Sequence, residues 1–327
     1  MKFLFIRLSS IGDIVLTSPL VRCLRQQMPG VEIHFVTKYK YRELLTANPH
    51  IDKVHLLDDH FGAMIALLKA ERFDYIIDLH HNLRSLRIKW ALGVPARSFR
   101  KLNLRKWLLV SLKMDLLPDQ HIVERYFGTL KEFGIGSDGR GLDFFIPAGG
   151  EYDRSRLPER YRNGYVAVII SGTYTTKQLP ADKVAEICDQ IRYPVILVGG
   201  NCETPMSREI DRRVGDHVHN LAGKTTISES ASLVREARLV LTNDTGMMHI
   251  AAAFGKKILS FWGNTVPQFG MYPYLPHPVS KIMEVEGLKC RPCSKLGHHH
   301  CPRGHFRCMK EMDIRAAVDW IHTHYGE

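Results

Sequence analysis

The sequence lacks any apolar run of the roughly 18 residues that a membrane-spanning helix requires. Its first apolar stretch, residues 3–6, is interrupted by Arg7 and has no small-residue cleavage site, so it does not resemble a secretory signal peptide. Apolar residues form 45% and charged residues 24% of the 327 residues, which excludes a disordered or fibrous chain. We therefore expect a cytoplasmic protein of about two domains.

Acidic residues are missing from one long stretch, between Leu79 and Met114, in a chain of net charge +11. Trp90, Phe99 and Trp107 are interleaved there with basic residues. Such a stretch can bind nucleic acid, an anionic membrane surface or an acidic substrate, and it can also be only a solvated face. Its basic members are Arg84, Arg87, Lys89, Arg97, Arg100, Lys101, Arg105, Lys106 and Lys113.

The first half of the chain alternates strand-like and helix-like patterns. Short apolar runs predict strands, and apolar positions at helical spacing predict helices between them. This βαβα order indicates a parallel sheet with right-handed crossovers. The strands are expected at 3–8, 31–36, 54–57, 75–79 and 142–145, and the helices at 13–28, 41–47, 61–70 and 121–133.

Residues 147–164 are rich in Gly, Pro and charge and show little periodicity, which indicates an interdomain linker. The alternation then restarts, so we predict two doubly wound α/β domains of the Rossmann-like type: 1–150, then 164–312, followed by a C-terminal helix in 313–327. The second set of strands is expected at 166–170, 195–198, 217–221, 239–242 and 257–261. Its helices are expected at 183–190, 205–214, 227–235, 246–254 and 313–324.

Residues 9–13 join the first strand to its helix, at the edge of the sheet where such folds bind ligands. Asp13 stands three residues after Ser10, which is the spacing of a capping box, and the helix dipole favours an ionised carboxylate there. One interpretation is a helix cap without chemistry. The other is a general base that takes a proton from a hydroxyl group.

A second strand end carries Asp244, Thr245 and Gly246 at the start of a helix. Free backbone N–H groups beside a glycine suit a phosphate group. His249 follows Thr245 by four residues and therefore shares its helix face. The alternative is that Asp244 only caps the helix and His249 is a core histidine.

Two further strand ends carry weaker signals. Thr173 and Lys177 offer a hydroxyl and an ammonium group, which suit a diphosphate, although the GxxxxGK[ST] spacing of a P-loop is absent. Glu203 follows Gly199 and Gly200, in a position suited to binding ribose hydroxyls.

Taken in order, these segments resemble glycosyltransferase family nine, the ADP-heptose:lipopolysaccharide heptosyltransferases, over nearly the whole chain. The ordered set is far more specific than any one of its members. It comprises IRLSSIGD at residues 6–13, His121 with Arg125 and Tyr126, Lys177, Gly199 and Gly200 with Glu203, and NDTG at residues 243–246 with His249.

The resemblance implies a GT-B fold and a metal-independent, inverting transfer of a heptose from an ADP-sugar to a lipopolysaccharide inner-core acceptor. By position, Asp13 would be the general base and Lys177 would neutralise the diphosphate. The resemblance assigns the remaining donor contacts to Thr173 near the diphosphate, Glu203 on the ribose, Asp244 on the sugar, the Thr245 and Gly246 amides on the diphosphate, and His249 on phosphate or sugar.

The chemistry agrees with that assignment, because a lysine and a helix N-terminus can stabilise a departing diphosphate without a divalent ion. No Asp-x-Asp cluster that would hold such an ion is present. The basic stretch suits an anionic glycolipid acceptor and docking on the inner leaflet, so we expect a peripheral membrane enzyme that binds no nucleic acid. The alternatives are a sugar-nucleotide epimerase or hydrolase of the same architecture, and a basic membrane- or RNA-binding protein.

The seven cysteines include four that form a Cys-x2-Cys-x7-Cys-x6-Cys pattern in a histidine-rich segment: Cys290, Cys293, Cys301 and Cys308. In a cytosolic protein this composition favours zinc over disulfides. Four thiolates would complete a tetrahedral structural site with no open position for catalysis. Because the spacing is not a standard zinc-finger spacing, reduced thiols and redox-sensitive pairs remain open beside structural zinc.

Overall fold

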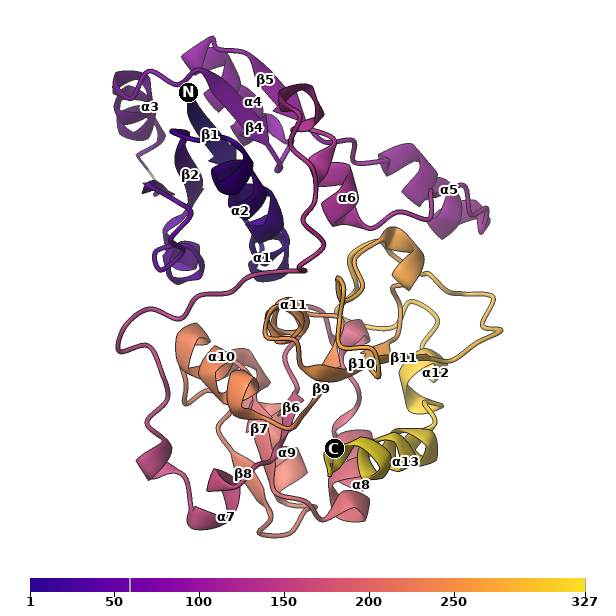
Figure 1. Ribbon diagram of the computed structural model, residues 1–327. Helices are drawn as coiled ribbons and strands as arrows, with labels where there is room; N and C mark the ends of the chain where they lie inside the picture. The colour runs from indigo at the N-terminus through magenta and orange to yellow at the C-terminus, as the bar shows by residue number, and fades with distance from the viewer. Residues whose placement is uncertain (59, 327) are drawn as a thin grey trace. The chain divides into compact units, whose positions relative to one another are not determined.

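The computed structural model describes residues 1–58 and 60–326 and contains two compact units (Figure 1). The first unit comprises Met1–Leu102 and Gln120–Ala148. The second comprises Asn103–Asp119 and the chain from Gly149 to the C-terminus. A continuous first domain over 1–150 is therefore wrong at 103–119, where the chain packs with the second unit. None of the described helices is long and apolar enough to cross a membrane.

The first unit is built on a five-stranded parallel sheet of order β3-β2-β1-β4-β5. Its central strands are buried on both faces, as in other parallel sheets covered by helices. Leu4 and Ile6 on one face pack beneath Met64 and Leu68 of α3 and Ile88 of α4. The strands are β1 (Lys2–Ile6), β2 (Glu32–Lys38), β3 (Lys53–Leu57), β4 (Tyr75–Asp78) and β5 (Ala96–Ser98), and the helices are α1 (Ile11–Val15), α2 (Ser18–Gln27), α3 (Phe61–Ala70), α4 (Leu83–Leu92) and α6 (Ile122–Phe127).

Four predictions for this unit need correction. The helix expected over 121–133 ends at Phe127, and a 3-10 helix follows at Lys131–Phe133. The helix expected over 13–28 is two helices, because the chain leaves the first at Leu16 and starts the second with Pro19 in its first turn. The helix expected over 41–47 is a 3-10 helix, Tyr39–Leu44. The segment 142–145 is not a strand: Asp143 instead binds α2, through an ion pair with Arg22 and a backbone hydrogen bond from its N–H to Ser18 Oγ at 2.8 Å.

The second unit contains a six-stranded parallel sheet of order β11-β10-β9-β6-β7-β8. One face packs against α8 and α13, where Val184 and Ile187 meet Ala317 and Ile321 in a hydrophobic core of this unit. The strands are β6 (Val166–Ile169), β7 (Val195–Val198), β8 (Val218–Asn220), β9 (Leu239–Asn243), β10 (Lys257–Trp262) and β11 (Lys281–Glu284). The helices are α5 (Asn103–Leu112), α7 (Glu159–Arg162), α8 (Ala181–Ile191), α9 (Thr204–Asp211), α10 (Ile227–Glu236), α11 (Gly246–Ala253), α12 (Arg307–Lys310) and α13 (Ile314–Tyr325).

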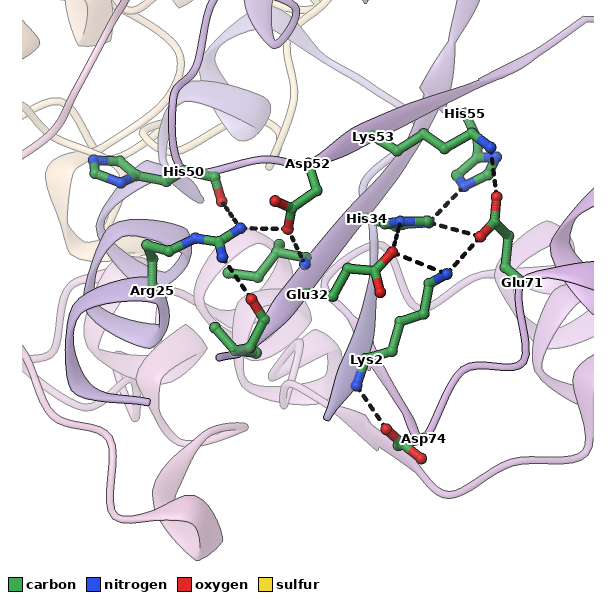
Figure 2. Close-up of polar contacts among 12 residues, drawn as sticks. Lys2, Arg25, Glu32, His34, His50, Asp52, Lys53, His55, Glu71 and Asp74 are labelled. Atoms are coloured by element: carbon green, nitrogen blue, oxygen red, sulfur yellow. Dashed lines mark hydrogen bonds and ion pairs between the residues drawn. The ribbon is translucent and has the colours of Figure 1, made fainter. Parts of the chain in front are cut away.

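A polar cluster lies at the amino ends of β1, β2 and β3 (Figure 2). His34 Nδ1 is 3.0 Å from His55 Nε2, and these atoms lie within 4.8 Å of a Glu71 oxygen, as metal ligands do. Lys2 Nζ and Lys53 Nζ each donate to Glu71 at 2.5 Å. A cation would have to displace these ammonium groups, so we interpret the cluster as a structural tie between strands.

Candidate active site

Each sheet has a point where the strand order reverses, and the candidate residues gather there. In the first unit the order reverses between β1 and β4, and in the second between β6 and β9. Ligands of doubly wound folds bind beyond the carboxyl ends of such strand pairs. Asp13 follows β1, Lys177 follows β6 and Asp244 follows β9.

Asp13 is the third residue of α1 and occupies a capping box with Ser10, as its spacing predicts. Its Oδ2 accepts from Ser10 N at 3.1 Å and Ser10 Oγ at 2.8 Å. Its Oδ1 lies 2.5 Å from Arg7 Nη2. Burial raises the pKa of Asp13, but Arg7 and the Ser10 hydrogen bonds outweigh it and leave the pKa below its usual value. The carboxylate is therefore ionised at neutral pH, as both interpretations of Asp13, a helix-capping residue and a general base, require.

Arg7 organises this part of the first unit, although no separate role was predicted for it. Its guanidinium also donates to Leu79 O, to Ser9 O at 2.8 Å and to Tyr126 OH at 3.1 Å. Arg7 thus brings Tyr126, from a distant family-like motif, next to Asp13 of its own motif. A signal for Arg7 was present, since it is the charged residue inside an otherwise apolar strand pattern.

Lys177 and Asp244 meet in the second unit, each beyond the carboxyl end of its strand. Lys177 Nζ is 2.6 Å from Asp244 Oδ2, and both side chains are less than one-fifth exposed. Thr265, in the loop after β10, donates its hydroxyl to the same Oδ2 at 2.8 Å. Thr265 was not predicted as a site residue, since its only signal in the sequence is its place after a strand.

Helix α11 begins at this ion pair with Thr245 as its N-cap. The Thr245 side chain makes no capping hydrogen bond, and its buried Oγ1 has no partner among the described residues. The first-turn N–H groups of the helix also lack intrahelical acceptors, which makes this end suited to an anion. His249 is 2% exposed one turn further on.

Glu203 and Thr173 have different surroundings. The Glu203 carboxylate is 7% exposed and accepts from Gly200 N at 2.8 Å and Gly172 N at 3.4 Å, so it ties together the loops after β6 and β7. Thr173 is exposed on the first of these loops. Asn243, which the sequence analysis quoted only in a motif, accepts from Leu179 N at 3.0 Å and donates to Ser171 O at 3.3 Å, so it holds the loop that carries Lys177.

The sequence model of glycosyltransferase family 9 (heptosyltransferase) matches residues 62–302, well over half of the chain. The chain belongs to this family. It is 26% identical to the lipooligosaccharide heptosyltransferase 2 of Haemophilus influenzae, with 92% of this chain and 94% of that protein covered. As family membership implies, it is a glycosyltransferase.

Solved structures of family members share the fold. The E. coli ADP-heptose lipopolysaccharide heptosyltransferase II is 20% identical with a TM-score of 0.78, over 99% of this chain and 98% of that one. The E. coli heptosyltransferase WaaC, solved with ADP, is 18% identical with a TM-score of 0.72, over 99% and 100%. The predicted GT-B architecture, two doubly wound domains, is confirmed.

The basic stretch of this glycosyltransferase is divided between the two units. Lys89 Nζ lies 2.9 Å from the buried Asp78 carboxylate, and Arg97 pairs with Glu132 at 2.6 Å, so neither is free to serve a ligand without breaking an ion pair. In the second unit, Lys113 donates to Pro292 O at 2.7 Å. The exposed members are Arg84, Arg87, Arg97, Arg100, Arg105 and Lys113, whereas Lys89, Lys101 and Lys106 are half-buried.

The four cysteines of the Cys-rich segment, residues 290–308, carry no disulfide. Cys308 is buried, and the other three are partly exposed. Cys290 Sγ lies 3.8 Å from His305 Nε2. Among the described residues, the group of potential metal ligands within 4.8 Å of one another is His34, His55 and Glu71, and it contains no cysteine. Zinc binding by the four cysteines would therefore require their thiols to move closer together.

Proposed function

We propose that the enzyme transfers a heptose from ADP-heptose to a lipopolysaccharide inner-core acceptor, with inversion and without a catalytic metal ion. The observation that carries this proposal is the Lys177–Asp244 pair at the start of α11. It offers a cation and free amides for a diphosphate beside a carboxylate for sugar hydroxyls. The names of the relatives support heptose as the transferred sugar and lipopolysaccharide as the acceptor. WaaC was solved with ADP, which supports ADP as the nucleotide of the donor.

The proposed roles divide between the two units. Asp13 takes the proton of the acceptor hydroxyl, and the oxygen of that hydroxyl bonds to the anomeric carbon of the donor. The bond from that carbon to the diphosphate breaks, and the ADP leaves with the electron pair. Lys177 and the Thr245 and Gly246 amides then stabilise the negative charge. Glu203 holds the ribose, Asp244 holds the sugar, and His249 supports the phosphate or the sugar.

Calorimetric titration with ADP, GDP, UDP and CDP in the absence of divalent metal tests the proposal. We expect selective binding of ADP. Preference for another nucleotide would keep a glycosyltransferase but reject ADP-heptose as the donor. Release of free sugar or an epimer from the donor without acceptor, at a rate matching transfer, would favour the epimerase or hydrolase alternative.

We further propose that the first unit docks on the anionic inner leaflet through α4, which makes the enzyme a cytoplasmic, peripheral membrane protein. Leu83 and Trp90 of this helix are 79% and 81% exposed, and the basic Arg84 and Arg87 stand exposed between them. Aromatic and basic side chains on one helix suit an anionic bilayer surface.

Charge reversal of Arg84 and Arg87 should weaken binding to vesicles containing phosphatidylglycerol by at least about tenfold, because each basic residue near such a surface contributes about 1 kcal/mol. Vesicle sedimentation at low and physiological salt measures this, and binding should fall as salt rises. Reversal of Arg212 and Arg213, exposed in the second unit, is the control and should have a smaller effect. Equal losses in the two variants would reject docking through α4.

For the Cys-rich segment we propose structural zinc bound by Cys290, Cys293, Cys301 and Cys308. Four thiolates are a ligand set that selects zinc or iron. Metal analysis of protein purified without a histidine tag should find about one zinc per chain. Replacement of Cys293 and Cys301 by serine should abolish it, whereas serine at Cys202, exposed outside the segment, should not. Well under one metal ion per chain would contradict the proposal.

A further inference from the structure

The loop after β10, residues 263–265, contains a buried polar side chain with no partner. Asn264 is 1% exposed, and neither its Oδ1 nor its Nδ2 has a hydrogen-bond partner among the described residues. Buried amides are normally paired, so an Asn with both atoms unpaired calls for a ligand or a function.

Both neighbours of Asn264 in the chain touch the donor site. On one side, Thr265 Oγ1 donates to Asp244 Oδ2 at 2.8 Å. On the other, Gly263 packs so closely that a Cβ there would lie 2.8 Å from Thr176 O, next to Lys177. The backbone of Asn264 therefore lies between a residue that bonds to Asp244 and one that packs against the residue before Lys177.

The Cys-rich segment holds this loop in place through Arg291. The Arg291 side chain is 7% exposed, and its guanidinium donates to three carbonyls of the strand end and loop: Gly263 O at 2.5 Å, Trp262 O at 3.1 Å and Thr265 O at 3.1 Å. Glu284 neutralises its charge at 2.9 Å. Cys293 N also donates to Asn264 O at 3.0 Å.

The same segment supports the loop that carries Lys177. Thr176 Oγ1 donates to His298 O at 2.9 Å and accepts from His298 N at 2.8 Å. Gly297 has φ +135°, and a Cβ there would lie 2.5 Å from Tyr174. Residues 291–298 thus fix the two loops that flank the Lys177–Asp244 pair.

We propose that the Asn264 carboxamide binds a hydroxyl of the donor sugar and that Arg291 is the positioning residue that holds it there. The reason is chemical: Oδ1 can only accept and Nδ2 can only donate, and a hydroxyl group offers the complement of both. A phosphate has only acceptor oxygens at neutral pH and would leave Oδ1 unpaired. This inference rests on the proposed function, since it names a contact to the sugar of the same donor.

Asn264→Leu tests the proposal, because leucine fills nearly the same space without polar atoms. We expect ADP affinity within about twofold of wild type, ADP-heptose affinity lowered about ten- to thirtyfold, and an unchanged or raised Tm. If Asn264 were merely structural, its replacement would not lower the affinity for ADP-heptose while leaving the affinity for ADP and the Tm unchanged. Asn48→Leu, a buried Asn in the first unit whose Oδ1 is paired, is the control and should lower Tm without that separation.

Arg291→Lys as a single substitution should lower the affinity for ADP-heptose. The same substitution should have a smaller effect on that affinity in Asn264→Leu, because Arg291 acts partly through Asn264. Unchanged ADP-heptose affinity in Asn264→Leu would overturn the proposal, and so would equal losses for ADP and ADP-heptose. Failure of the wild type to bind ADP would instead reject the proposed function.

Discussion

Replacement of Asp13 by asparagine should lower kcat by about 10²–10⁴-fold and leave the affinity for ADP unchanged. The range is the usual contribution of a general base. Asparagine keeps the shape of the side chain and can still accept from Ser10, but it cannot take the acceptor proton. ADP affinity should be unaffected because the proposed donor residues all belong to the second unit. Steady-state kinetics and calorimetry on the same preparation measure both quantities.

Asp182→Asn provides a matched control, since Asp182 also stands in the first turn of a helix, α8, and is exposed. Loss of a helix-dipole interaction costs a few tenths to about 1 kcal/mol of stability in either variant. Asp13→Asn also loses its ion pair with Arg7, so its Tm should fall further than that of the control. A fully active Asp13→Asn enzyme would reduce Asp13 to a capping residue. The pH dependence gives a further check: Arg7 holds the pKa of Asp13 below its usual 3.8, so protonation of Asp13 should not lower kcat/KM between pH 5 and pH 8.

Lys177→Ala should weaken ADP binding by about ten- to a hundredfold, since a charge-assisted contact contributes about 1.5–3 kcal/mol. The structure adds a second cause. Lys177 neutralises Asp244 at 2.6 Å, and without the lysine that carboxylate would repel the diphosphate. The double variant Lys177→Ala with Asp244→Asn should therefore recover part of the ADP affinity lost in the single variant.

Calorimetric titration with ADP measures both Lys177 variants. Lys183→Ala is the control, because Lys183 lies on α8 of the same unit and pairs with its helix neighbour Glu186, away from Asp244. ADP affinity equal to wild type in Lys177→Ala would contradict our placement of the diphosphate. Absence of any recovery in the double variant would show that the two residues act independently.

The sequence anticipated most of the fold because buried parallel strands leave a strong local signal. The strand 195–198 and the helix 61–70 occur as predicted. Helix α4 was not predicted from the sequence. Its apolar residues Leu83 and Trp90 are exposed to solvent, so its apolar positions do not follow the single buried face of an ordinary surface helix. The assignment of 103–119 to the second unit was also beyond reach, since it depends on contacts such as Leu109 with Val266 and Phe269.

The sequence by itself determined the family, most of the parallel strands along the chain and the residues at their carboxyl ends, since these depend on local pattern and parallel topology. It placed Asp13, Lys177 and Asp244 at sheet edges where ligands bind. Only the tertiary structure decided which side chains position these residues and the loop beside them. Arg7 contacts Asp13, Thr265 contacts Asp244, and Arg291 bonds to the loop that contains Asn264. Arg291, for example, lies 28 residues along the chain from Gly263, whose carbonyl accepts its hydrogen bond. Local spacing carries no record of a hydrogen bond formed when distant loops pack together.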